Sequence, residues 1–323
     1  MVIDAHAHVC GDDPESLALL EELGVKLLNI CVAIGDWRTD VYPRFRSLAK
    51  IHPDRYAWCT SFDLPDPSVP EAEYADRVIE TLQSDFGRGA VAVKAWKNIG
   101  MELRRADGSF AMIDDAVFDP LYEFLEREGH PILMHIGEPI GCWLPLDESS
   151  PHYGYYRNHP EWHLFGREGV PSHAELIAAR DHVLARHPRL RVIGAHMGSL
   201  AHDVREVAAR LDRYPNFAVD ISARLGDLMR QPTADVSAFF ATYRDRVLFG
   251  TDLVHKQPIS SQPPHERARI HDSIRAAYTR SFQYLETDRI CEHNGYASQG
   301  LNLDPEILER VYVANARSWY PGL

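Results

Sequence analysis

The chain has 323 residues, a length that fits one large α/β barrel or two ordinary domains. Its hydrophobic fraction of 45% is typical of a globular protein with a sizeable core. The formal net charge is −13, and the sequence contains no run of lysine or arginine. The composition therefore argues against nucleic acid or an anionic membrane as the main partner, but it says little about a small substrate, because local charge in a pocket can oppose the net charge. The expected partner is a small-molecule substrate, and a homodimer or higher homo-oligomer is left open.

Short apolar runs alternate with longer amphipathic segments along the chain. After a first strand that begins at Val2, strands are predicted at 26–33, 56–62, 90–96, 131–135, 191–196, 217–221 and 246–251. Helices are predicted at 13–24, 43–51, 70–86, 115–128, 172–187, 199–214, 233–244 and 305–319. Eight strand–helix units without a low-complexity linker favour an α/β fold, a (β/α)8 TIM barrel that forms a single domain over residues 1–323.

Two predicted connections are longer than ordinary loops, namely 136–171 after strand five and 253–304 after strand eight. In a barrel both leave the C-terminal face, where active sites lie. We favour a pocket wall for the first insertion. For the second insertion, a pocket wall and an oligomerisation element remain equally open.

The five cysteines are scattered and include no Cys-x-x-Cys pair, which is typical of free thiols in a reducing compartment. The N-terminus shows no signal-peptide pattern, and no apolar run reaches membrane-spanning length. We therefore expect a cytoplasmic protein, although a chain trimmed of its leader would look the same.

The first strand carries two histidines, His6 and His8, directly after the apolar pair Val2-Ile3. A spacing of two residues on a strand places both imidazoles on one face. Two converging imidazoles supply half of a tetrahedral zinc site, so this pattern favours a metal centre.

Polar residues of ligand or base type follow most of the later apolar runs. A lone histidine at a strand end is more often a hydrogen-bonded core or rim residue, but a barrel brings all strand ends to one mouth. The residues concerned are Lys94 after strand four, His135 after strand five, His196 after strand six and Asp252 after strand eight.

These motifs resemble the amidohydrolase superfamily. The resemblance rests on the His-x-His of strand one, the histidine after strand five, the segment 193–198 (IGAHMG) and the segment 249–252 (FGTD). More narrowly, the chain resembles the amidohydrolase-related branch that holds aminocarboxymuconate-semialdehyde decarboxylase and the resorcylate and carboxyvanillate decarboxylases. The segment 313–317 (VANAR) also resembles the C-terminal helix of that branch.

The resemblance implies that one divalent metal, Zn²⁺ in our prediction, is bound by His6, His8, His135 and Asp252. His196 would then act as acid/base beside a metal-activated water, and Asp252 could also take a proton from it. Lys94 stands near the position of a carboxylated lysine that bridges two metals in binuclear relatives. We favour a cationic anchor for a substrate carboxylate at Lys94, with the bridge and a plain strand-end lysine as alternatives.

Further substrate-binding candidates lie after strands five and seven. The first insertion is rich in aromatic residues, and pockets are commonly lined by such side chains with a few polar groups. Each of these side chains could equally pack the insertion onto the barrel, and the arginine after strand seven could simply pair with Asp220. The candidates are Glu138, Arg157, Trp162, His163 and Arg224.

The leading interpretation is a metal-dependent hydrolase in which activated water attacks a carbonyl carbon of a small, carboxylate-bearing substrate. A nonoxidative decarboxylase of an aromatic or dienoic acid is the alternative on the same fold. A non-catalytic binding protein on the same scaffold is a remote third possibility, because every expected ligand type is present at the strand ends.

Overall fold

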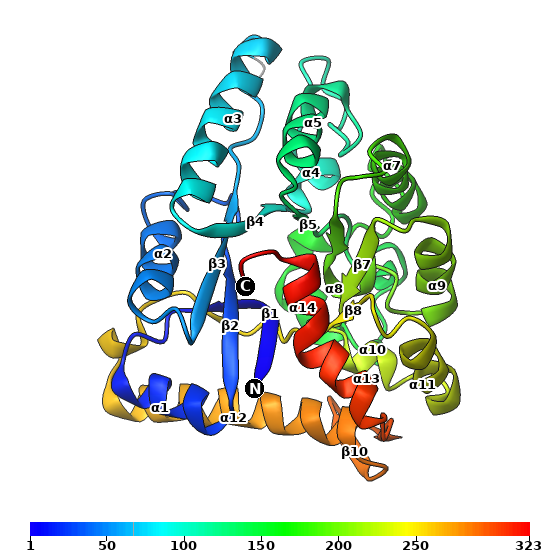
Figure 1. The fold of residues 1–323 in the computed structure, drawn as a ribbon. Coiled ribbons are helices and arrows are strands. Elements are labelled where there is room, and N and C mark those ends of the chain that lie inside the picture. Colours follow the sequence, from blue (N-terminus) through cyan, green and yellow to red (C-terminus); the bar gives the residue numbers. More distant parts are fainter. Residues whose placement is uncertain (67) are drawn as a thin grey trace.

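The computed structural model describes residues 1–66 and 68–323 and places a ring of parallel strands inside a layer of helices (Figure 1). The strands pair in the order β8-β7-β6-β5-β4-β3-β2-β1-β9. Their bounds are β1 Val2–Val9, β2 Val25–Ile30, β3 Tyr56–Ser61, β4 Ala90–Ala95, β5 Ile132–Met134, β6 Val192–Gly194, β7 Phe217–Asp220, β8 Val247–Leu248 and β9 Val254–His255.

The backbone beyond β8 joins the first strand and closes the ring. The amide of Ala5 donates to the carbonyl of Phe249 at 2.9 Å, and the amide of Asp252 donates to the carbonyl of His6 at 2.8 Å. Each neighbouring pair from β1 to β8 is parallel. The predicted α/β barrel is therefore confirmed, with a shorter eighth strand than the sequence indicated.

Two apolar layers hold the barrel together. The inner layer takes side chains from every strand of the ring, among them Ile3, Leu28, Leu133 and Leu248, and is continued by Trp319 of the C-terminal helix. Figure 1 shows that helix, α14 (Asn315–Trp319), lying in front of the ring of strands near the C-terminus. The outer layer packs the strands against the surrounding helices. The strands whose ends carry the polar residues are consequently packed between an inner and an outer apolar layer.

The helices that cover the barrel follow the predicted segments, with boundaries displaced by a few residues. They are α1 Pro14–Glu22, α2 Val41–Ile51, α3 Glu71–Gly87, α5 Asp119–Glu128, α7 His173–Arg186, α9 Val204–Arg213 and α11 Thr233–Thr242. The segment 305–319 is helical through α13 (Pro305–Glu309), a π-helical turn at Arg310–Ala314, and α14. Short helical turns also follow β4, β6 and β7, namely α4 Asn98–Met101, α8 Ala195–Gly198 and α10 Leu225–Leu228.

The first strand is not regular, and this irregularity aims its histidines. Asp4 is opposite Leu27 of β2, whereas Ala7 is opposite Asn29, so β1 holds one extra residue in between. Ala5 packs in the inner layer and Ala7 in the outer layer, although simple alternation would put both on one side. The bulge thus changes the facing of the chain immediately before His6, as bulges near active sites often do.

The two insertions differ in structure. The first contains 3₁₀ turns at Ile140–Trp143 and Pro160–Trp162 and the short helix α6 (Tyr153–Asn158). The second contains β9, the 23-residue helix α12 (Pro264–Glu286) and an antiparallel hairpin of β10 (Ile290–His293) and β11 (Tyr296–Gln299). The sequence analysis predicted no helix at α12, where buried apolar positions are sparse. In the described part of the chain, no helix combines the length and apolar character needed to cross a membrane.

Candidate metal centre

The two histidines of β1 meet the aspartate that follows β8. His8 Nε2 lies 3.3 Å from Asp252 Oδ1, and His6 Nε2 lies 3.7 Å from the same oxygen. The two imidazole centroids are 5.5 Å apart. Both histidines are buried and Asp252 is partly exposed. The structure therefore brings three of the four predicted metal ligands together.

The Nδ1 atom of each histidine in this cluster is already engaged by an acceptor. His8 Nδ1 lies 2.7 Å from the carbonyl of Ile30, which can only accept a hydrogen bond. His6 Nδ1 lies 2.9 Å from Asp220 Oδ2, a carboxylate whose pKa burial would raise but whose contacts with His6 hold below its usual range. Both rings therefore carry their proton on Nδ1 and present a lone pair at Nε2.

These lone pairs face a carboxylate, which makes the cluster a site for a cation. Burial lowers the pKa of His8 to about 4, so its ring is neutral near pH 7. Burial alone would raise the pKa of Asp252, but its contact with His8 and the charges of the neighbouring histidines lower it below its usual range. Two neutral nitrogens and one carboxylate oxygen converging without a proton between them fit a divalent ion well.

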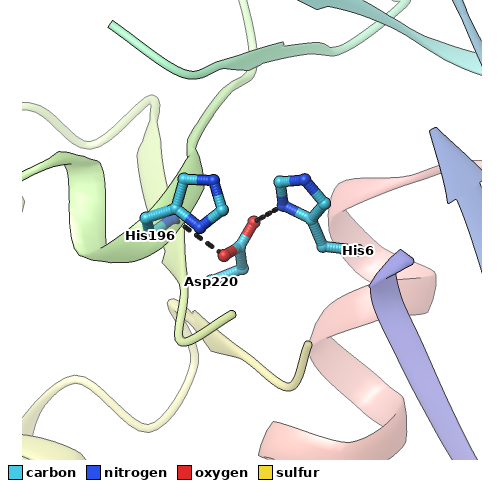
Figure 2. Close-up of side chains that lie close together, drawn as sticks. All are labelled: His6, His196 and Asp220. Carbon is cyan, nitrogen blue, oxygen red and sulfur yellow. Dashed lines mark hydrogen bonds and ion pairs between the residues drawn. The ribbon is translucent and has the colours of Figure 1, made fainter. Parts of the chain in front are cut away.

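A second group of side chains shares His6 but has a different chemistry (Figure 2). Asp220, at the end of β7, lies between His6 and His196 and contacts both. Its Oδ1 accepts from the backbone amide of His196 at 2.9 Å and from the hydroxyl and amide of Ser222. Because both oxygens of Asp220 are occupied by N–H and O–H donors, this carboxylate acts as a hydrogen-bond brace for His6.

Asp220 was given no site role in the sequence analysis, which mentioned it only as a simple pairing partner for Arg224. The signal was present, because Asp220 ends the apolar run of β7 just as the other candidates end theirs. The structure pairs it with His6 and His196 instead.

His196 offers an unprotonated nitrogen to the site. Its Nδ1 lies 2.8 Å from the carbonyl of Ser222, so the proton sits on Nδ1 and Nε2 is free. Burial lowers the pKa of His196 well below its ordinary value, which keeps the ring neutral. Such a nitrogen can take up a proton from a reacting group or bind a metal.

His135 stands beside His196 and has an unsatisfied nitrogen. The two ring centroids are 4.3 Å apart in an edge-to-face arrangement. His135 Nε2 is buried and has no hydrogen-bond partner among the described residues. Burial also lowers the pKa of His135, so its ring is neutral. A buried nitrogen of this kind is costly unless it receives a ligand.

The backbone at two of these residues is strained. His196 has a φ of 58° and Asp252 a φ of 60°, both in the left-handed region that non-glycine residues seldom adopt. Strain of this kind, on the order of 1–3 kcal/mol per residue, persists only where the surroundings enforce it and clusters at functional sites.

Lys94 reaches the same cluster from β4. Its Nζ lies 3.3 Å from His6 Nε2, and the side chain is buried. Burial lowers the pKa of Lys94 to about 8, against the charges of Asp220 and Asp252. The strand-end lysine therefore lies at the cluster of His6, His8 and Asp252.

A second buried lysine, Lys97, is surrounded by residues of the first insertion. Its ammonium forms an ion pair with Glu138, donates to Tyr155 Oη at 3.1 Å and lies 3.8 Å from the ring centre of Trp162. Glu138 and Trp162 were both predicted as substrate contacts, and the structure places both against Lys97. Lys97 carries no signal in the sequence, because only the packing of the first insertion surrounds it with these partners.

The remaining candidates are dispersed. Arg224 is buried, donates to the carbonyl of Ala223 at 2.9 Å, and has an Nε with no partner among the described residues. His163 Nε2 lies 2.9 Å from the carbonyl of Leu144, within the first insertion. Arg157 is exposed on α6. The structure thus leaves Arg224 as a buried cation with unused donors and places the other two in the insertion.

The first insertion lines a cavity of about 550 Å³. Its walls combine Pro139, Leu144 and Tyr156 with Asp227 and Arg230 from the segment after β7. Tyr156 also donates to Glu138 at 3.3 Å, so one ring joins the cavity to the surroundings of Lys97. The insertion lines this cavity, whose walls include none of the four predicted metal ligands.

Comparison with known proteins adds a family to this geometry. A family model described as amidohydrolase matches residues 41–322, which is most of the chain. The match begins after β1, so the assignment of His6 and His8 rests on the geometry above. No curated protein sequence matches this chain.

Solved structures share the fold. The 4-oxalomesaconate hydratase of Rhodopseudomonas palustris has a TM-score of 0.55 at 13% identity, covering 100% of this chain and 96% of that one. The 2,6-dihydroxybenzoate decarboxylase of Rhizobium has a TM-score of 0.52 at 18% identity, with coverages of 99% and 97%. The 5-carboxyvanillate decarboxylase of Sphingomonas paucimobilis gives 0.50 at 16%, with coverages of 95% and 82%.

Proposed function

Because this chain belongs to the amidohydrolase family, a family of enzymes, we propose that it is a divalent-metal-dependent hydrolase acting on a carbonyl carbon. The observation that carries the proposal is the convergence of His6 Nε2 and His8 Nε2 on Asp252 while both Nδ1 atoms are held by other acceptors. The ion would be held by His6, His8, Asp252 and His135, whose unpartnered Nε2 supplies the fourth ligand. We propose zinc because three imidazoles and one carboxylate suit it.

The ion supplies Lewis-acid polarisation of a substrate oxygen and a lowered pKa for a coordinated water. The chain's own residues then handle protons. His196 Nε2 accepts a proton from the attacking water and returns it to the leaving group, while the Nδ1 contact with Ser222 fixes the ring. The Asp252 carboxylate is the second proton acceptor within the cluster.

Substrate binding is proposed to rely on cations that lack a partner. Arg224 has unused donors in a buried position, and a substrate carboxylate would satisfy them. Lys97 already has its carboxylate in Glu138, so this pair shapes the pocket wall with Trp162 rather than binding an anion. Arg157 and His163 are proposed to contribute only from the outer part of the same insertion.

Lys94 has two proposed roles that metal analysis separates. As a substrate anchor it would leave the mononuclear site intact, whereas as a carboxylated bridge it would hold a second ion. A Lys94→Met variant that keeps its metal but binds substrate more weakly supports the anchor. Loss of a second metal equivalent supports the binuclear alternative.

The second candidate function is a nonoxidative decarboxylase of an aromatic or dienoic acid. It is favoured by the unpaired Arg224 near the site and by two structural relatives that are decarboxylases of aromatic acids. The two functions differ in product. We expect a new acid with an alcohol or amine from hydrolysis, and CO₂ without consumption of water from decarboxylation. Mass spectrometric analysis of reactions with panels of esters, amides and carboxylated aromatics distinguishes them.

We also propose a cytoplasmic location. Its support is that Cys10, Cys31, Cys59, Cys142 and Cys291 are all buried free thiols.

A further inference from the structure

Asp4 is a buried carboxylate whose partners are all neutral. Its Oδ1 accepts from the amides of His6 and Thr251, both at 3.1 Å. Its Oδ2 accepts from the Thr251 hydroxyl at 2.5 Å and from the Tyr278 hydroxyl at 2.7 Å. A carboxylate without a cation is expensive to bury unless hydrogen bonds satisfy both of its oxygens, as they do here. Such a group calls for an explanation beyond core packing.

The partners of Asp4 place it behind the metal centre. Asp4 precedes the bulge of β1, between Ile3 and Ala5, which both point into the inner layer of the barrel. Its side chain consequently points outward, while His6 beyond the bulge points to the site. The contact from Asp4 Oδ1 to the amide of His6 spans this bulge and fixes the change of direction.

The same carboxylate fixes the chain on the other side of the cluster. Thr251 is bound by Asp4 through both its amide and its hydroxyl, and the next residue is the ligand Asp252. Asp252 adopts a φ of 60°, and its amide donates to the carbonyl of His6. A strained conformation needs neighbours that enforce it, and Asp4 supplies that constraint one residue before the strained position.

The fourth hydrogen bond to Asp4 comes from a residue of the second insertion. Tyr278 is fully buried on α12, the long helix whose presence the sequence did not indicate. This helix is tied to α1 by the His271–Ser16 contact at 2.9 Å and the Arg275–Glu22 ion pair. β9, at the start of the insertion, pairs with β1 at His8. The insertion therefore runs along the back of the histidine strand.

We propose that Asp4 and Tyr278 are positioning residues that set the affinity of the metal site by holding His6 and Asp252 in register. This role rests on the proposed metal centre and assigns the second insertion a task that is neither pocket wall nor oligomerisation element. Groups that orient metal ligands from behind commonly change metal affinity by about 10- to 100-fold when removed. A carboxylate that served only the core would affect folding stability and leave metal affinity unchanged.

The test removes one hydroxyl at a time and leaves every proposed ligand in place. The variants are Tyr278→Phe and Thr251→Val, and the matched control is Tyr284→Phe, which changes another buried tyrosine of α12. Each full-length protein is stripped of metal, and its zinc dissociation constant is measured by competition with a chromogenic chelator. The melting temperature of each metal-free protein is measured in parallel.

We expect Tyr278→Phe and Thr251→Val to weaken zinc binding by about 10-fold each, and Tyr284→Phe to change it less than about twofold. If Tyr278→Phe and Tyr284→Phe lower the melting temperature equally but only Tyr278→Phe weakens zinc binding, the loss of zinc affinity is not a consequence of general destabilisation. Zinc affinity within about twofold of wild type in both test variants would overturn the positioning role and leave the metal site standing. A wild-type chain that binds no zinc would instead overturn the metal centre, and the positioning role with it.

Discussion

Two groups of histidine and aspartate share His6, and they differ in which atoms meet. In the first, the Nε2 atoms of His6 and His8 face Asp252 at 3.7 and 3.3 Å. In the second, Asp220 receives the Nδ1 proton of His6 at 2.9 Å and the amide of His196. Both groups have the composition and proximity of a metal site. In the first group the Nδ1 atoms of His6 and His8 are directed to Asp220 and to the carbonyl of Ile30, so the Nε2 atoms face Asp252, with Lys94 Nζ beside His6.

The difference shows that histidine and aspartate side chains lying close together do not by themselves identify a metal site. What matters is whether the atoms that face one another carry N–H or O–H protons. Asp220 is satisfied by hydrogen bonds and fixes the tautomer of His6. Asp252 faces atoms that carry no proton. The brace and the ligand therefore play complementary parts, with one carboxylate behind the imidazole and the other in front of it.

The largest expected effect is the loss of bound metal when the side chains of the first group are removed. Asp252→Asn or the double variant His6→Ala/His8→Ala should lose the metal, from about one equivalent per chain to nearly none, since each removes primary ligands. Elemental analysis of purified proteins measures this. Normal metal content in both variants would contradict the assignment of these ligands.

The next effect separates binding from catalysis at His196. Because His196 is placed as a proton carrier, His196→Asn should retain the metal while turnover falls by about 100- to 10,000-fold. Elemental analysis and steady-state rates on the same preparation provide the two readouts. A variant that loses metal along with activity would make His196 a ligand and the site binuclear.

A smaller effect on metal affinity is expected when Asp220, the hydrogen-bond brace of His6, is replaced. Asp220→Asn should weaken metal binding by about 10- to 100-fold without abolishing it, because His6 loses its orienting acceptor. Chelator competition measures the affinity. Asp227→Asn is the matched control, since Asp227 is also a buried carboxylate near β7 but pairs with His152. Complete loss of metal in Asp220→Asn alone would turn the brace into a ligand.

The smallest expected effect is a weaker binding of substrate when Arg224 is replaced. Arg224→Gln should raise KM by about 10- to 100-fold, as expected for losing a charged hydrogen bond of about 1.5–3 kcal/mol. Metal content should not change. Arg213→Gln, at an exposed position on α9, serves as control and should leave KM close to wild type. Equal KM values for the two variants would remove Arg224 from the binding site.

Much of the site could be predicted from sequence because strand ends are easy to locate. An apolar run followed at once by His135, His196 or Asp252 predicts both the strand and the end of the barrel at which that side chain lies. Asp220 carried the same signal and was overlooked as a site residue. These predictions needed only local pattern and the geometry of a parallel barrel.

The rest depends on contacts between distant segments. The bulge in β1 is defined by its register with β2, which no local pattern specifies. The partners of Lys97 come from the first insertion, and Tyr278 reaches Asp4 from a position 274 residues away. The long helix α12 is stabilised by packing on α1 rather than by a strong apolar period of its own.

The most direct test of the account is a crystal structure of the zinc-loaded protein with anomalous diffraction recorded at the zinc edge. We predict one strong anomalous peak within bonding distance of His6 Nε2, His8 Nε2 and Asp252, with Asp220 still bonded to His6 Nδ1. A peak bound instead by Asp220 and His196, or no peak at the barrel mouth, would contradict it.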